Sequence, residues 1–142
     1  VQADGADLSR WPDGHFDWVQ TTMFLHELSY ASMKAIFAET HRVLASGGFV
    51  LHVEQPQYAA DMPLFEQAMR DWDCFYNNEP FWSTLHEIDL DGWLVEAGFR
   101  REALLHVGVT AVVDRELFPD AADDDSEDYG RKAAWHVIGA RK

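Results

Sequence analysis

The fold is decided by one stretch, FDWVQTTMFLHELSYASMKAIFAETHRVLASGGFVLHVE, which spans residues 16–54. Its first part, residues 16–22, reads as a short buried strand. Residues 32–45 place apolar side chains at helical spacing, which predicts an amphipathic helix, and Gly47 offers a left-handed stop at its end. Residues 49–54 form a near-continuous apolar run, typical of a strand covered on both faces. A strand, a crossover helix and a second strand make a parallel, right-handed unit.

The remainder of the chain adds helices and strands to this unit. Residues 57–88 interrupt the alternation of strands and helices and predict a helix that begins after Asp61. A compact helix is expected between Asp89, as its N-cap, and Gly98, as its stop. Ser32 is the expected N-cap of the crossover helix. The segments expected to form the last two strands are residues 102–113 and 133–140.

Length and charge restrict the classes of protein to consider. The chain has 142 residues, so we expect a single domain over 1–142. Its net charge of −14 argues against nucleic acid and against anionic membranes as partners, because both need a basic surface. No apolar stretch approaches the roughly 20 residues that span a bilayer. The single cysteine, Cys74, fits a reducing compartment such as the cytoplasm. The acidic segment 114–130 lacks the calcium-loop pattern and is expected to be a solvated loop.

Three short motifs follow one another along the first third of the chain. They are Asp4-Gly5-Ala6-Asp7-Leu8 with Pro12-Asp13-Gly14-His15-Phe16-Asp17, then Leu25-His26-Glu27-Leu28, and finally Arg42-Val43-Leu44 with Gly47-Gly48. In this order, they resemble the C-terminal part of the class I S-adenosylmethionine-dependent methyltransferase family. The resemblance implies an α/β fold with an incomplete Rossmann-like sheet. That sheet would be mostly parallel, with an antiparallel last strand between its two predecessors and helices on both faces.

The same resemblance implies S-adenosylmethionine as the cofactor. Asp4 would accept a hydrogen bond from the adenine amino group, and Gly5 would offer its backbone N–H to the ring. A nucleotide-type cofactor also needs glycines that bring backbone N–H groups close to it. No two glycines of this sequence stand two apart, so the G-x-G loop is absent, and so is the acidic residue that would hold the ribose. We therefore expect weak or absent cofactor binding by this chain alone.

The function implied is methyl transfer to a small-molecule acceptor, by this chain or by a longer protein of which it is a fragment. The alternative is a non-catalytic module that self-associates through its truncated sheet. Because the cofactor loop is missing, the sequence leaves open whether the chain is an enzyme. A strand followed by G-x-G in the coding sequence upstream would decide for the first interpretation.

Polar side chains near the predicted strand ends are the candidates for chemistry. His26 follows the first strand and Glu54 ends the second, and the carboxyl ends of parallel strands are where α/β sites form. His26, Glu54 and His86 are the candidate general bases. The alternative is that the first two are hydrogen-bonded polar residues at the edge of the sheet. None of the histidines shows a metal-ligand spacing such as H-E-x-x-H, so no metal site is expected.

The segment 57–88 is an aromatic helical insert, and inserts at this position often cap the substrate in the resembled family. Small-molecule sites combine aromatic walls with a few polar groups. Tyr76, Asn77 and Trp82 stand at or beyond the end of the expected helix and are the candidate substrate contacts. Phe65 and Trp72 are expected to point inward and to form core. The alternative for the whole insert is a core or dimer interface.

The strand at 16–22 also bears on assembly. It carries one charge, Asp17, and no proline. An apolar strand at the edge of a sheet exposes unpaired backbone groups that invite pairing with another chain. We therefore expect a homodimer, or a higher oligomer, that buries this edge and part of the aromatic insert at 62–82, with closed two-fold symmetry as the favoured form.

Overall fold

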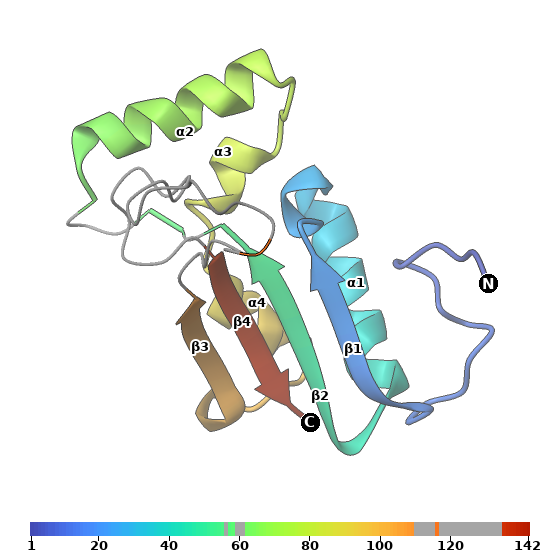
Figure 1. The fold of residues 1–142 in the computed structure, drawn as a ribbon. Coiled ribbons are helices and arrows are strands. Elements are labelled where there is room, and N and C mark those ends of the chain that lie inside the picture. Colours follow the sequence, from blue (N-terminus) through green and yellow to red (C-terminus); the bar gives the residue numbers. More distant parts are fainter. Residues whose placement is uncertain (56, 59–61, 110–115, 117–134) are drawn as a thin grey trace.

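The computed structural model describes residues 1–55, 57–58, 62–109, 116 and 135–142. Its elements, in chain order, are β1 (Phe16–Thr22), the 3-10 turn η1 (Leu25–Glu27), α1 (Tyr30–Val43), β2 (Leu44–Glu54), α2 (Leu64–Tyr76), α3 (Trp82–Leu85), α4 (Leu90–Glu96), the 3-10 turn η2 (Arg101–Ala103), β3 (Leu104–Val109) and β4 (Trp135–Arg141). The four strands form one mixed sheet in the order β1-β2-β4-β3 (Figure 1).

The sheet has the strand directions that the sequence predicts. β1 runs parallel to β2, while β4 is antiparallel to both of its neighbours, β2 and β3. The last strand therefore lies between its two predecessors, and it alone opposes the direction of the others. This arrangement is the α/β, partial Rossmann-like methyltransferase sheet that the resemblance implies.

The crossover helix α1 begins and ends two residues earlier than expected. Its N-cap is Ser29, whose side chain accepts a hydrogen bond from the backbone N–H of Ser32, the residue that the sequence analysis takes as the cap. Its last residue is Val43, because Leu44 already has the extended backbone that starts β2. Gly47, with a φ of 84°, therefore lies inside β2 and is not the stop of the helix.

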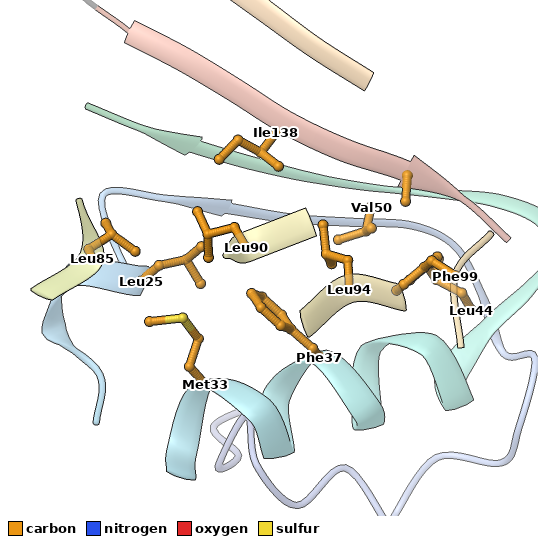
Figure 2. Close-up of a cluster of buried hydrophobic side chains, with 11 residues drawn as sticks. Leu25, Met33, Phe37, Leu44, Val50, Leu85, Leu90, Leu94, Phe99 and Ile138 are labelled. Carbon is orange, nitrogen blue, oxygen red and sulfur yellow. The ribbon is translucent and has the colours of Figure 1, made fainter. Parts of the chain in front are cut away.

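The hydrophobic core lies between the sheet and the two helices α1 and α4, as Figure 2 shows. Both helices direct their apolar residues at the same face of the sheet. The buried side chains of this cluster include Met33 and Phe37 from α1, Leu90 and Leu94 from α4, and Val50 and Ile138 from the strands. The resemblance implies helices on both faces of the sheet, but α1 and α4 lie on the same face, where their buried side chains form one core.

The opposite face of the sheet carries apolar side chains that are exposed. Side chains alternate between the two faces along a strand, so the neighbours of Val50 and Ile138 in sequence point away from the core. Among the elements that the structure describes, no helix packs over this second face (Figure 1). Its exposed large residues are Trp18, Phe49, Val107, Val109 and Trp135. β1 has a strand partner on one side only within the described sheet.

The later elements follow the sequence closely. The Asp89 side chain accepts a hydrogen bond from the backbone N–H of Gly92 at 2.8 Å, and Gly98 adopts a φ of 114° after the helix, so the cap and the stop of α4 are confirmed. β3 and β4 lie within or next to the segments predicted for them. Asp61, residues 110–113 and the acidic segment 114–130, apart from residue 116, lie outside the described residues.

Candidate functional site

The candidate site lies at the carboxyl ends of β1 and β2, which meet at one edge of the sheet (Figure 1). The turn η1 follows β1 directly, and the backbone N–H of Met23 donates to the carbonyl of Val53 at 2.9 Å. Met23 has a φ of 49°, a conformation that turns the chain sharply after the strand. This turn brings η1 back over the end of β2, where Glu54 is the last residue.

Glu54 anchors this turn. Its Oε1 accepts hydrogen bonds from the backbone N–H groups of Phe24 and Leu25, at 2.8 and 2.7 Å. The side chain is 1% exposed, so the desolvation of its charge is offset by these N–H donors. The sequence analysis proposes Glu54 as a candidate base; the structure gives it the additional role of holding η1 in place.

His26 is the second partner of Glu54. Its Nδ1 lies 2.8 Å from Oε2 of Glu54, and its ring stacks on Trp82 with a centroid distance of 4.7 Å. A carboxylate can only accept, so Nδ1 carries the proton and Nε2 faces away from Glu54. The hydrogen bond to Glu54 raises the pKa of His26, and the charges of Glu54, Glu79 and Glu27 act in the same direction, against the opposing effect of burial. The pair expected at the strand ends is thus brought together.

Two further carboxylates, those of Glu27 and Glu79, lie close to His26, and Glu79 comes from a distant part of the chain. One ring nitrogen of His26 and one carboxylate oxygen each from Glu27 and Glu79 lie within 4.8 Å of one another. Oε1 of Glu27 is 3.8 Å from Nε2 of His26. The sequence analysis does not single out Glu79, because it lies in the loop after α2 and no motif relates it to His26.

A cavity of about 480 Å³ opens beside Glu79. Two of its lining residues, Asp71 and Glu79, are acidic and none is basic, so it favours polar or cationic groups over anions. Its lining residues are Asp71, Cys74, Phe75, Asn78, Glu79, Pro80 and Ser83. Since Glu79 belongs both to this lining and to the cluster with His26, the cavity and the His26–Glu54 pair are neighbours.

The three candidate substrate residues flank this cavity in sequence but are not among its lining residues. Tyr76 is 62% exposed and packs against Trp72, and Asn77 is exposed at the end of α2. Trp82 is 8% exposed and begins α3, where it forms a wall behind His26. Phe65 and Trp72, expected to be core, are 67% and 52% exposed, so this prediction is wrong.

His86 lies apart from the His26–Glu54 pair in the packing of the insert. It is 4% exposed, and its ring stacks on Tyr58 at 4.4 Å with nearly parallel planes. The hydroxyl of Tyr58 in turn donates to Oδ1 of Asp71 at 2.6 Å. Burial and this hydrogen bond raise the pKa of Tyr58. His86 thus connects through Tyr58 to the acidic lining of the cavity.

The two candidate cofactor contacts lie in the loop before β1. Oδ1 of Asp4 accepts a hydrogen bond from the backbone N–H of Ala6 at 2.9 Å. Gly5 approaches α1 closely: a Cβ built on it would lie 3.4 Å from Cγ1 of Ile36. The loop is therefore fixed against α1, with the Asp4 carboxylate exposed to solvent.

These observations define a class of protein: a Rossmann-like α/β sheet with a polar site at the carboxyl ends of its parallel strands. Residues 1–52 match the family of methyltransferase domains. Over 99 residues, which make up 70% of this chain, it is 31% identical to an uncharacterised methyltransferase of the cyanobacterium Synechocystis sp.. The chain belongs to the class I S-adenosylmethionine-dependent methyltransferase family.

Solved structures agree on the fold. A methyltransferase from Archaeoglobus fulgidus superposes with a TM-score of 0.64 at 15% identity, over 100% of this chain and 66% of that one. A possible histamine N-methyltransferase from Thermotoga maritima gives 0.62 at 20% identity, over 100% of this chain and 63% of that one. The aligned part is 45% of the length of the Synechocystis relative, so the chain corresponds to part of its relatives. None of the described helices is long and apolar enough to cross a membrane.

Proposed function

We propose that this chain carries the acceptor side of an S-adenosylmethionine-dependent methyl transfer to a small molecule. The observation that supports it most directly is the His26–Glu54 pair, which lies at the carboxyl edge of the sheet beside a cavity of about 480 Å³. Methyl transfer needs mainly the alignment of donor and nucleophile, with a base where the nucleophile must lose a proton. A buried pair next to a cavity is suited to both tasks.

Each residue has a part in this proposal. Asp4 and Gly5 contact the adenine end of the cofactor. Glu54 fixes the tautomer of His26, so that the lone pair of Nε2 accepts a proton from the acceptor. Tyr76 and Asn77, which lie in sequence between the lining residues Phe75 and Asn78, contact the acceptor, and Trp82 holds the His26 ring. His86 acts through Tyr58 on the acidic side of the cavity.

The cofactor contact is tested on the chain itself. Because the sequence has no G-x-G loop, we expect binding weak enough to require millimolar S-adenosylmethionine. At that concentration, amide NMR signals of Asp4 and Gly5 should shift. Asp4→Ala should abolish these shifts, whereas Asp17→Ala, an exposed carboxylate on β1, should not. An absence of shifts at Asp4 and Gly5 in the unmodified chain contradicts this cofactor assignment.

The methyl transfer is tested on the protein as its gene encodes it. Transfer of a labelled methyl group to a panel of small amines, phenols and carboxylic acids should depend on His26. We expect His26→Gln to lower kcat by about 10²–10⁴, the contribution of a positioned acid or base. Glu87→Gln, an exposed residue, is the matched control. Unchanged activity in His26→Gln excludes the proton-accepting role of this residue.

A second candidate function, a self-associating module of the cytoplasm, rests on a separate observation. β1 has a free edge within the described sheet, and the sheet face opposite the core exposes Trp18 and Phe49. Exposed edges and apolar patches are typical of interaction surfaces. We propose that the chain forms a homodimer through this edge, whether or not it is catalytic. The cytoplasmic location is proposed from the single cysteine, Cys74.

A further inference from the structure

His26 uses only one of its two ring nitrogens in a hydrogen bond to another described residue. His26 is 4% exposed, and its Nδ1 is bound to Glu54. Its Nε2 has no hydrogen-bond partner among the described residues, and Oε1 of Glu27 is 3.8 Å away, beyond hydrogen-bond distance. Nε2 of His26 is not one of the fully buried side-chain atoms without a partner in the described part of the chain, so a water molecule or an incoming ligand can reach it. In the neutral imidazole, with its Nδ1–H donated to Glu54, Nε2 carries the lone pair that can bind a ligand.

Two carboxylates surround the same point. The ligand-type atoms of His26, Glu27 and Glu79 all lie within 4.8 Å of one another. Nitrogen and oxygen ligands sit about 2.0–2.2 Å from a zinc ion, so two ligands of one ion are roughly 3–4.4 Å apart. The distance of 3.8 Å between Nε2 of His26 and Oε1 of Glu27 lies within that range, and the 4.8 Å that bounds the whole cluster is only slightly above it. Glu27 is 57% exposed on its side chain, so it can close the remaining gap by a change of rotamer.

Glu54 supplies the support that such a site needs. Histidines that bind metals usually donate their second ring N–H to a carboxylate, which fixes the tautomer and the orientation of the ring. Here the carboxylate is itself fixed by the backbone N–H groups of Phe24 and Leu25. Trp82 stacks on the ring from one side. The histidine is thus oriented before any ligand arrives.

We propose that His26, Glu27 and Glu79 form a binding site for a divalent transition-metal cation of the Zn²⁺ type. One imidazole nitrogen and two carboxylates favour such a cation over Mg²⁺ or Ca²⁺, which prefer oxygen ligands alone. Three protein ligands leave a coordination position open. Because Glu79 also lines the cavity of about 480 Å³, that position is accessible to a water molecule or to a ligand in the cavity.

The cation site is independent of the proposed methyl transfer, but the two share the lone pair of Nε2. That lone pair can accept a proton or bind a cation, not both at once. Bound cation would therefore suppress a methyl transfer that depends on His26 as a base. The binding experiment below measures the cation directly, so it holds or fails whatever the outcome of the activity assay.

The test is a titration of the whole chain with Co²⁺, whose visible absorption reports its coordination, and with Zn²⁺ by calorimetry. We expect saturable binding of one cation, weakened at least about tenfold in Glu79→Gln and in Glu27→Gln, since even supporting residues of metal sites contribute about 10–100-fold. Glu102→Gln is the matched control, since Glu102 is 70% exposed and remote from the cluster in sequence. His26→Gln is avoided because it also disturbs the buried Glu54.

A competing pair of histidines must be distinguished from this site. Nδ1 of His106 and Nε2 of His136 lie 3.2 Å apart across β3 and β4, close enough to bind one cation together. His106→Gln should leave the Co²⁺ spectrum and the Zn²⁺ affinity unchanged. Loss of binding in His106→Gln, equal binding in Glu79→Gln and the unmodified chain, or no saturable binding up to millimolar cation would each overturn the proposal.

Discussion

At the scale of single residues, Trp82 carries the clearest consequence. Its indole is buried and stacked on His26, so removal of the ring leaves a cavity behind the site. We expect Trp82→Ala to lower the free energy of unfolding by about 3–5 kcal/mol. Trp72→Ala, which removes an equally large but half-exposed ring, should cost less than about 1 kcal/mol. Urea denaturation measures both changes in the free energy of unfolding. If Trp82→Ala costs as little as Trp72→Ala, Trp82 lies in an open pocket instead of the core.

His52 predicts a pH dependence of stability. It is fully buried, with Nδ1 2.7 Å from Oγ1 of Thr21, and burial lowers its pKa to about 4. In the unfolded chain its pKa is about 6.5, so the unfolded state binds the proton first as the pH falls. The stabilisation is complete above about pH 6.5 and is lost between about pH 6.5 and 4, by about 3 kcal/mol in total.

Replacement of this one histidine isolates its contribution. In His52→Gln, the difference in unfolding free energy between pH 7.5 and pH 5 should be smaller than in the unmodified chain. His15→Gln, a replacement in the exposed loop before β1, is the control and should retain the full difference. An identical pH dependence in His52→Gln would show that His52 is protonated in the folded state at pH 5.

At the scale of secondary-structure elements, α4 gives a simple test of local stability. The side chain of its N-cap, Asp89, accepts a hydrogen bond from the backbone N–H of Gly92 at the start of this seven-residue helix. We expect Asp89→Ala to cost about 1 kcal/mol in the free energy of unfolding, whereas Asp89→Ser should retain most of it. Thermal denaturation followed by circular dichroism measures both. A neutral Asp89→Ala would mean that packing of Leu90 and Leu94 alone fixes the helix.

The elements also show what sequence could and could not predict. The unit from β1 to β2 was predictable because its apolar spacing, its short turns and its parallel direction are local properties. The helix α2 was assigned with the wrong face inward. The sequence analysis turns Phe65 and Trp72 toward the core, but both are exposed, whereas Arg70, which pairs with Glu66 at 2.7 Å, is buried. Periodicity shows that a helix has two faces but not which face meets the core.

The candidate site also combines residues that the sequence could bring together with residues that it could not. His26 and Glu54 could be placed together because both follow parallel strands, whose carboxyl ends share one edge. Glu79 and Trp82 reach the same edge only through the tertiary placement of the insert, and no spacing relates them to His26. The stack of Trp82 on His26 and the cluster with Glu79 are therefore findings of the structure alone.

At the scale of the whole molecule, the sheet is unequally covered. One face packs on α1 and α4, while the other exposes Trp18 and Phe49 next to the free edge of β1. A cavity of about 220 Å³, lined on all sides by apolar residues, lies against the same edge. Its lining residues are Leu8, Trp11, Phe16, Trp18, Val19 and Val43. Apolar surface of this kind, beside an unpaired strand, favours association with a second copy of the sheet.

We therefore predict that the chain is a homodimer at micromolar concentration, measured by light scattering. Trp18→Lys should produce a monomer, because Trp18 is 53% exposed beside the edge and a charge there opposes pairing. Val19 is unsuitable for this test, since its side chain packs against the core. Glu102→Lys, a charge change on an exposed residue, is the control and should remain dimeric.

The outcome also separates two surfaces that can bring copies of the chain together. The aromatic outward face of α2 is the other exposed apolar surface, and Phe75, at 78% exposure, is its most accessible ring. If Phe75→Lys produces the monomer and Trp18→Lys does not, the copies associate through the insert and the sheet edge remains unpaired. Burial of apolar surface is the main driving force for association, and for this reason both surfaces are expected to bind a second copy. If the unmodified chain is a monomer, this expectation is wrong for both surfaces.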